Sequence, residues 1–131
     1  MRKLRVLVVD DNLLFLSAVR NLLSGLPEVG CAEYVNSGAE ALARAAEFRP
    51  DLVLMDIVMP GMNGLEAMRA LRDRVPAPRI YAVTLHDSPE MLAAALKNGA
   101  ADLIPKHEFA EKISGLIAQL ACDEGAVSSS C

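Results

Sequence analysis

Two short apolar runs, each followed or closed by aspartate, constrain this chain more than any other feature. Leu4–Val9 and Leu52–Met55 are rich in β-branched residues and almost free of polar ones, which is typical of strands buried on both faces of a parallel sheet. Asp10 and Asp11 follow the first run, and Asp56 follows the second. Ligands of open α/β sheets bind outside the carboxyl ends of the strands. We therefore expect the three carboxylates to converge in one crevice.

Strand-like and helix-like segments alternate along the rest of the chain. Further strands are expected at residues 31–35, 80–84 and 102–106, and amphipathic helices at residues 13–24, 38–49, 65–75, 89–98 and 109–120. Ser37-Gly38-Ala39-Glu40 is a capping-box sequence, Ser88-Pro89 places proline at a first helical position, and Pro60–Gly64 is expected to form a loop. Strict alternation predicts an α/β fold: a doubly wound, parallel, five-stranded sheet with right-handed crossovers and helices on both faces.

Length and composition limit the possible classes of protein. The 131 residues suit one domain, expected at residues 1–122, followed by a disordered tail at 123–131. The net charge of −4 provides no basic footprint for nucleic acid, and no apolar stretch is long enough to cross a membrane. The start of the chain leads directly into a strand, so we expect a cytoplasmic protein. Cys31, Cys122 and Cys131 form no metal-ligand pattern, and we expect reduced thiols, with Cys31 buried.

Carboxylates at the expected strand ends predict metal-assisted phosphoryl chemistry. Asp10, Asp11 and Asp56 offer the hard oxygen ligands that Mg²⁺ prefers. A divalent cation offsets the repulsion between a carboxylate nucleophile and a phosphoryl group. Thr84, at the end of one strand, can donate a hydroxyl hydrogen bond to a phosphoryl oxygen, and Lys106, at the end of another, can supply a positive charge.

These motifs together resemble the receiver domain of two-component response regulators. The resemblance runs to Leu120 and rests on order and approximate spacing as well as on residue types. The motifs that carry it are Val8-Val9-Asp10-Asp11-Asn12, Met55-Asp56-Ile57-Val58-Met59-Pro60-Gly61-Met62-Asn63-Gly64, Thr84, and Gly99-Ala100 before Lys106. The resemblance implies a flavodoxin-like (βα)5 fold with strand order 2-1-3-4-5.

The same resemblance implies a role for each site residue. Asp56 would be the phosphoacceptor. Asp11 and Asp56 would bind Mg²⁺ directly, Asp10 would bind it through water, and the backbone carbonyl of Val58 would complete the protein ligands. Thr84 would be the switch hydroxyl and Lys106 the phosphoryl contact.

The resemblance also implies partners and a mode of action. The phosphoryl group would come from the phosphohistidine of a sensor histidine kinase or a phosphotransfer protein, and a homodimer could form through the fourth helix, fifth strand and fifth helix. Such a domain is not an enzyme beyond its own phosphotransfer and autodephosphorylation. It binds neither nucleic acid nor membrane itself. Its phosphorylation shifts a two-state equilibrium that controls a partner or an output domain.

Three positions depart from the family pattern. Leu103 stands where the family has its switch aromatic, so no rotating aromatic at that position can report phosphorylation. Leu85, after the switch hydroxyl, is bulkier than usual and could shield an acyl phosphate from water. His107 follows Lys106 where the family often has proline, and a cis peptide there would be a costly non-proline one.

Other functions remain as alternatives. Residues 83–87 resemble receivers that precede helix-turn-helix domains, so the chain could be the excised receiver of a DNA-binding transcriptional regulator. A magnesium-dependent phosphohydrolase of the haloacid-dehalogenase type is disfavoured, because Val58 stands where its second aspartate belongs. A flavin-binding electron carrier is disfavoured because Asp10 and Asp11 would repel a phosphate.

Overall fold

The computed structural model describes residues 3–58 and 64–126, and of 123–126 only the backbone. In these residues the strands are β1 (Leu4–Val9), β2 (Val29–Val35), β3 (Leu52–Asp56), β4 (Arg79–Thr84) and β5 (Asp102–Pro105). The α-helices are α1 (Leu13–Ser24), α2 (Gly38–Phe48), α3 (Gly64–Arg72), α4 (Pro89–Lys97) and α5 (Phe109–Ala126), with a 3₁₀ turn at Lys106–Glu108. All strand pairs are parallel, in the order β2-β1-β3-β4-β5. The predicted fold and strand order are confirmed.

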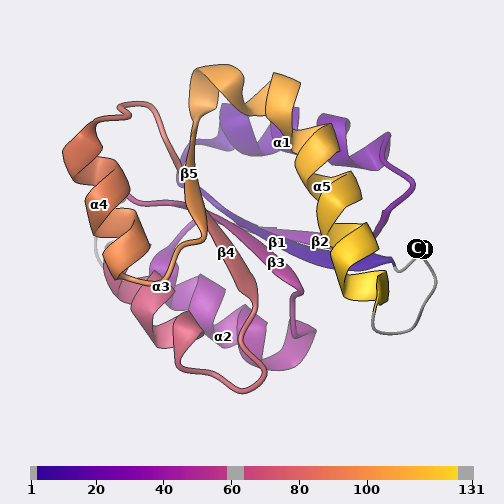
Figure 1. The fold of residues 1–131 in the computed structure, drawn as a ribbon, viewed down its shortest axis with the longest axis horizontal. Helices are drawn as coiled ribbons and strands as arrows, with labels where there is room; N and C mark the ends of the chain where they lie inside the picture. The colour runs from indigo at the N-terminus through magenta and orange to yellow at the C-terminus, as the bar shows by residue number, and fades with distance from the viewer. Residues whose placement is uncertain (1–2, 59–63, 127–131) are drawn as a thin grey trace.

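The sheet separates two helical layers (Figure 1). On one face α1 and α5 pack through residues such as Val19 and Ile117, and on the other α2, α3 and α4 pack through residues such as Phe48 and Met68. Strand β3 is buried along its whole length, because helices cover it on both sides. Its unbroken apolar sequence therefore reflects its central place in the sheet.

Local sequence signals fix where several helices begin. Asn12 Oδ1 accepts hydrogen bonds from the backbone of α1, and Ser37 Oγ accepts one from Glu40 N at 3.1 Å. Glu40 Oε1 in turn accepts from Asn36 N at 3.2 Å. The predicted capping box is therefore present, except that the Glu40 side chain bonds the N–H of Asn36 instead of that of the N-cap residue Ser37. Ser88 Oγ accepts from Met91 N at the start of α4.

Helix α4 is held mainly at its carboxyl end. Among its residues only Ala95 is fully buried, while Leu92 and Leu96 are exposed. Asn98 caps the helix, and its Oδ1 accepts two hydrogen bonds from the Arg69 guanidinium of α3, at 2.7 and 3.0 Å. The link between α3 and α4 is therefore polar and local.

The structure differs from the sequence predictions in the buried residues of α1, the exposure of Cys31 and the start of β2. The helical periodicity predicts a buried stripe of Phe15, Val19 and Leu22 in α1, but the buried residues are Leu16, Val19 and Leu23, and Phe15 and Leu22 are only half-buried. Cys31 is exposed rather than buried, because it lies on edge strand β2. Strand β2 starts two residues earlier than expected.

The end of the chain also departs from expectation. Helix α5 continues to Ala126, so the first residues of the predicted tail are helical. Residues 127–131, like most of the predicted loop at 60–64, lie outside the described residues, and the domain boundary at residue 122 stays a prediction. No helix among the described residues is both long and apolar enough to span a bilayer.

Candidate functional site

The three predicted carboxylates meet at the carboxyl ends of β1 and β3. Asp10 follows β1, where its N–H donates to Val35 O of β2, and Asp56 ends the neighbouring strand β3. One carboxylate oxygen from each of Asp10, Asp11 and Asp56 lies within 4.8 Å of the other two. Asp10 and Asp56 are buried, while Asp11 faces solvent. The convergence predicted from the strand ends is therefore present.

Lys106 lies inside this cluster. Its Nζ is 2.7 Å from Asp10 Oδ2 and 3.5 Å from Asp56 Oδ2, and its side chain is only 8% exposed. The residue follows β5 directly and opens the 3₁₀ turn, which directs the chain toward α5. One ammonium against three carboxylates leaves the cluster with a formal charge of −2.

The donor set suits a divalent metal ion. Asp10 Oδ1 accepts from Asn12 N at 2.8 Å, but its Oδ2 has no hydrogen-bond partner among the described residues. Lys106 Nζ is near enough to that oxygen for an ion pair, yet the two are not aligned as a hydrogen bond. A buried oxygen without a hydrogen bond, in a cluster of charge −2, fits the oxygen-rich and partly hydrated coordination that Mg²⁺ prefers.

Burial is the main influence on the Asp56 carboxyl group. It raises the pKa of Asp56, because the charged form is poorly solvated there. The Val58 N–H, which donates to Asp56 Oδ1 at 3.0 Å, acts in the opposite direction, the Asp10 charge raises the pKa again, and Lys106 lowers it. The net result is a raised pKa, so a positive charge added beside Asp56 would favour its ionised form.

Gly64 makes room for the backbone at Asp56. A Cβ atom at this position would lie 2.3 Å from Asp56 O and 2.5 Å from Ile57 Cα. These distances are far below van der Waals contact, and the atoms concerned belong to the backbone. The first residue of α3 must therefore lack a side chain for the end of β3 to keep its path.

Thr84 is present at the predicted strand end, but its hydroxyl bonds the loop that follows. Thr84 Oγ1 accepts from His86 N at 3.2 Å and lies 3.4 Å from His86 O, to which it can donate. The residue is 1% exposed and pairs with Pro105, directly before Lys106. Its backbone is thus next to the cluster, whereas its hydroxyl forms no hydrogen bond with the three carboxylates in the part of the chain described.

The remaining predicted positions are placed as follows. The Val58 side chain is exposed, and its N–H faces Asp56; the role of its carbonyl stays a prediction. Leu103 packs half-buried against the α2–α3–α4 core, and Leu85 is 64% exposed. The one cis peptide among the described residues joins Val75 and Pro76, so the bond after Lys106 is trans.

Sequence reasoning missed the aromatic neighbour of Lys106. The Lys106 Nζ lies 4.5 Å from the centroid of the Phe15 ring, within cation–π range. Phe15 in turn meets Phe109 edge to face, with centroids 5.4 Å apart and planes at 71°. Phe15 belongs to the apolar pattern of α1, but nothing in the sequence indicated that its ring would face the charge of Lys106, which follows β5.

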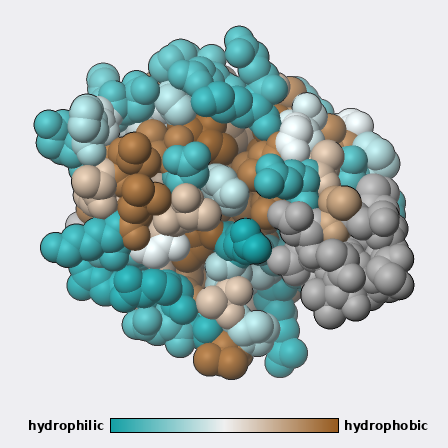
Figure 2. Space-filling view, in the orientation of Figure 1, coloured by the Kyte–Doolittle hydropathy of each residue, from teal (hydrophilic) through white to brown (hydrophobic). Residues whose placement is uncertain are grey.

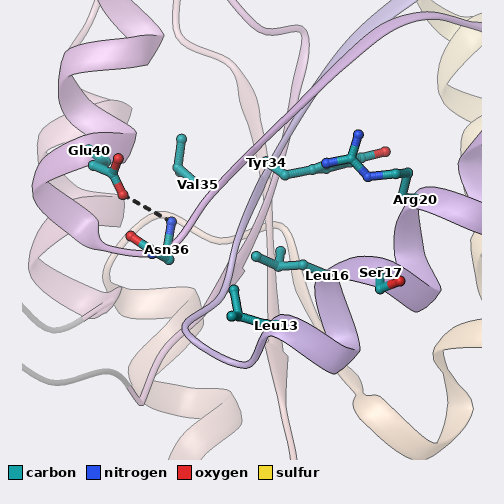
Figure 3. Close-up of a pocket in the computed structure, with 8 residues that line it drawn as sticks. All are labelled: Leu13, Leu16, Ser17, Arg20, Tyr34, Val35, Asn36 and Glu40. Atoms are coloured by element: carbon teal, nitrogen blue, oxygen red, sulfur yellow. Dashed lines mark hydrogen bonds between the residues drawn. The ribbon is translucent and has the colours of Figure 1, made fainter.

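A small cavity of about 300 Å³ opens beside the cluster, between α1, β2 and the start of α2 (Figure 3). Leu13 and Leu16 lie on the α1 side, and the Arg20 guanidinium stacks on the Tyr34 ring, 4.3 Å from its centroid. The cavity shares the carboxyl-end edge of the sheet with the carboxylates, since Val35 lines it and accepts the Asp10 N–H.

Comparisons with known proteins agree with this geometry. Residues 6–118 match the family described as response regulator receiver domain. Among solved structures, the signal receiver domain of the response regulator NarL from Mycobacterium tuberculosis is 32% identical, with a TM-score of 0.84, over 92% of this chain and 98% of that one. The response regulator domain of Thermotoga maritima CheB is 29% identical, with a TM-score of 0.81, over 92% of this chain and 97% of that one.

Curated relatives are longer proteins. A protein-glutamate methylesterase/protein-glutamine glutaminase from Pyrococcus abyssi is 38% identical over 106 residues, which are 80% of this chain but only 29% of that protein. The transcriptional regulatory protein DegU from Brevibacillus brevis is 32% identical over 111 residues, 85% of this chain and 47% of that protein. The chain therefore spans less than half the length of either relative.

Proposed function

This chain belongs to the response regulator receiver domain family, and from that premise we propose that Asp56 is its phosphoacceptor. The observation that carries the proposal is the buried Asp10–Asp56–Lys106 cluster, in which one ammonium contacts both carboxylates. Receiver domains are phosphorylation-dependent signalling switches, and a carboxylate flanked by a second carboxylate and a fixed cation is the arrangement that such a reaction requires.

The chain's own residues would bind one Mg²⁺ ion. Asp11 and Asp56 would be direct ligands, Asp10 a ligand through water, and the Val58 carbonyl the last protein ligand. The ion, when bound, supplies charge compensation between the Asp56 carboxylate and the incoming phosphoryl group. Asp10 Oδ2 supports this set, because it is paired with the Lys106 charge but has no hydrogen bond among the described residues, and a metal-bound water would supply one.

Phosphotransfer then needs three events at residues of this chain. An Asp56 carboxylate oxygen attacks phosphorus while the bond from phosphorus to the donor's imidazole nitrogen breaks and its electron pair stays on that nitrogen. Lys106 Nζ, already 3.5 Å from Asp56 Oδ2, would stabilise the charge on a phosphoryl oxygen. Thr84 would exchange its hydrogen bond with His86 for one to another phosphoryl oxygen, and the loop before α4 would shift accordingly.

The donor and the output are proposed from the family. The donor would be the phosphohistidine of a sensor histidine kinase or a phosphotransfer protein in the cytoplasm. A homodimer could use α4, β5 and α5, since Leu92 and Leu96 are exposed there and Figure 2 shows apolar side chains gathered on the face between α4 and β5. No nucleic-acid or membrane binding is proposed for this domain.

Two output types are suggested by the relatives. The names NarL and DegU belong to a response regulator and a transcriptional regulatory protein, whereas the Pyrococcus relative is named as a methylesterase and glutaminase. The matched part is 29% of that enzyme, and the chain itself is proposed to catalyse nothing beyond its own phosphotransfer and autodephosphorylation.

Acetyl phosphate treatment followed by intact-protein mass spectrometry tests the assignment. We expect one added phosphate with Mg²⁺, none with chelator and none in Asp56→Asn. Asp51→Asn is the matched control, because Asp51 is a carboxylate at the opposite end of β3. Full phosphorylation of Asp56→Asn would refute the proposal, and steady hydrolysis of p-nitrophenyl phosphate would favour the phosphohydrolase alternative.

A further inference from the structure

A second cavity, of about 670 Å³, lies at the opposite end of the sheet from the carboxylates. It is formed where α2 leads into β3 and where α3 leads into β4, with the start of β1 between them. Among the residues that the structure describes, the polar ones that line it are four arginines and one aspartate: Arg5, Arg49, Arg74, Arg79 and Asp51. No residue of the phosphorylation site contributes to it.

Backbone hydrogen bonds fix three of these residues in a row across the sheet. Asp51 N donates to Arg5 O at 2.8 Å, and Arg79 N donates to Asp51 O at 2.9 Å. Asp51 Oδ2 also accepts from Arg5 N at 2.9 Å. Because β1, β3 and β4 are adjacent strands, the two arginines flank the single carboxylate at a rigid edge.

Two of the four guanidinium groups are held in place by α2. Arg5 Nε donates to Phe48 O at 2.8 Å and stacks 4.4 Å above the centroid of the Phe48 ring. Arg74 Nη2 donates to Leu42 O at 2.8 Å. Arg5 Nη1 also lies 3.9 Å from Cys31 Sγ, to which it can donate, so each guanidinium uses only part of its five N–H donors within the fold.

The other two guanidinium groups, those of Arg49 and Arg79, have no side-chain partner among the described residues. Within residues 3–58 and 64–126, the side chains of Arg49 and Arg79 form no hydrogen bond, ion pair or ring contact. Arg49 also has a left-handed backbone, with φ 53° and ψ 65°, at the C-cap of α2. Glycine is favoured at such a position, and another residue there costs about 1–2 kcal/mol. A strained position is thus occupied by a long cationic side chain that has no bonding partner in the part of the chain that the structure describes.

The charge of the cavity is opposite to that of the molecule. Four guanidinium groups and one carboxylate give a formal charge of +3, in a chain whose net charge is −4. The volume falls within the range of about 300–1,000 Å³ that is usual for small-ligand sites. Alanine, proline and valine residues form the remaining walls: Ala45, Ala46, Pro50, Val75, Pro76, Ala77 and Pro78.

We propose that this cavity binds a small organic polyphosphate of the nucleoside diphosphate class. Guanidinium forks match phosphate oxygens two at a time, and Arg49 and Arg79 together can bind adjacent phosphate groups. The alanine and proline walls provide an apolar surface for the base. The site is independent of Asp56 and does not rest on the function proposed above.

Titration of the full chain with ADP and, separately, with pyrophosphate tests the proposal, in chelator so that no metal bridges the probe to the carboxylates. Amide NMR shifts should saturate and should cluster at the lining residues, with ADP binding more tightly than pyrophosphate. The double variant Arg49→Gln/Arg79→Gln should bind ADP at least about tenfold more weakly, which is the lower end of what a hydrogen bond to a charged group contributes. Arg72→Gln, an exposed arginine beside α4, is the control and should change affinity less than about twofold.

Each other outcome overturns the proposal. Absence of saturation by either probe at millimolar concentration would remove the site, and equal weakening by Arg72→Gln would show a general charge effect. If pyrophosphate bound as tightly as ADP, the apolar walls would contribute nothing to binding, and the assignment to the nucleoside diphosphate class would be wrong. Saturation by a polyglutamate peptide, with no response to either phosphate compound, would assign the cavity to an acidic protein segment. A far-UV circular dichroism spectrum and a melting temperature unchanged from the wild type would verify that the fold of the double variant is intact.

Discussion

The contact between Lys106 and Phe15 predicts a measurable energetic coupling. Replacing Phe15 with leucine removes the ring but keeps an apolar side chain on α1, and replacing Lys106 with glutamine removes the charge. A double-mutant cycle with both variants isolates the interaction between the two side chains. Their separation of 4.5 Å, with Lys106 only 8% exposed, places the pair among desolvated cation–π contacts.

The expected size follows from that geometry. A cation–π contact contributes about 0.5–1 kcal/mol at an exposed site and about 2 kcal/mol when desolvated. Because Lys106 is buried and Phe15 is half-buried, we expect a coupling free energy of about 1–2 kcal/mol. The single variant Phe15→Leu should lower the free energy of unfolding by more than this coupling, because it also removes the edge-to-face pair with Phe109, which contributes about another 0.5–1.5 kcal/mol.

Urea unfolding of the wild type, both single variants and the double variant gives the four free energies. Leu22→Ala provides the control cycle, because Leu22 lies on the same helix, seven residues or about 10 Å along its axis from Phe15. Its combination with Lys106→Gln should be additive within about 0.5 kcal/mol. A coupling between Phe15 and Lys106 no larger than that of the control would refute the cation–π interpretation.

Four further predictions concern the phosphorylation site. Burial raises the pKa of the Asp56 carboxyl group in the folded protein above its ordinary value of 3.8. The folded state therefore holds this proton more tightly than the unfolded state, and the resulting stability of the fold is fully present below pH 3.8 and is lost as pH rises through the folded-state pKa. Metal-free melting curves from pH 4 to 7 should therefore show the wild type losing stability relative to Asp56→Asn, and parallel curves would contradict the raised pKa. Mg²⁺ at a hundredfold excess over its dissociation constant should stabilise the wild type by about 2.7 kcal/mol, and most of this should vanish in Asp11→Asn; equal shifts would exclude Asp11 as a ligand. Amide NMR on beryllofluoride addition should show the distal shifts lost in Thr84→Ala but kept in Leu103→Ala, and the reverse pattern would be decisive against the switch hydroxyl. Gly64→Ala should lower the free energy of unfolding by about 1–3 kcal/mol, because the new Cβ meets the Asp56 backbone; denaturation at neutral pH measures this.

Strand ends were the part of the site that the sequence could predict. An apolar run shows where a buried strand stops, and parallel topology brings those stops to one edge of the sheet. Asp10, Asp56 and Lys106 therefore come together although nearly a hundred residues separate the first from the last. The orientation of the Thr84 hydroxyl toward His86 depends on the loop path, which no periodicity encodes.

Contacts across the fold could not be predicted in the same way. Adjacent helical stripes on α1 satisfy the same periodicity, so packing against the sheet had to decide between Phe15 and Leu16 as the deeper residue. The arginine cavity is collected from residues 5, 49, 74 and 79, on separate segments, and has no local spacing to reveal it. The sequence predicted a helix over residues 38–49, but not the left-handed conformation of Arg49 at its end.

The light anchoring of α4 has a consequence for how the domain can change shape. Amide groups of an element open with a local free energy set by the apolar surface it buries, and α4 fully buries only Ala95. Its polar attachment to Arg69 lies at the far end from Thr84, whereas at the end nearer the phosphorylation site Met91 is only half-buried and Ser88 caps the helix. Two conformations that differ by a few kcal/mol are enough for a population shift. The sheet can therefore stay rigid while one helix samples alternative positions.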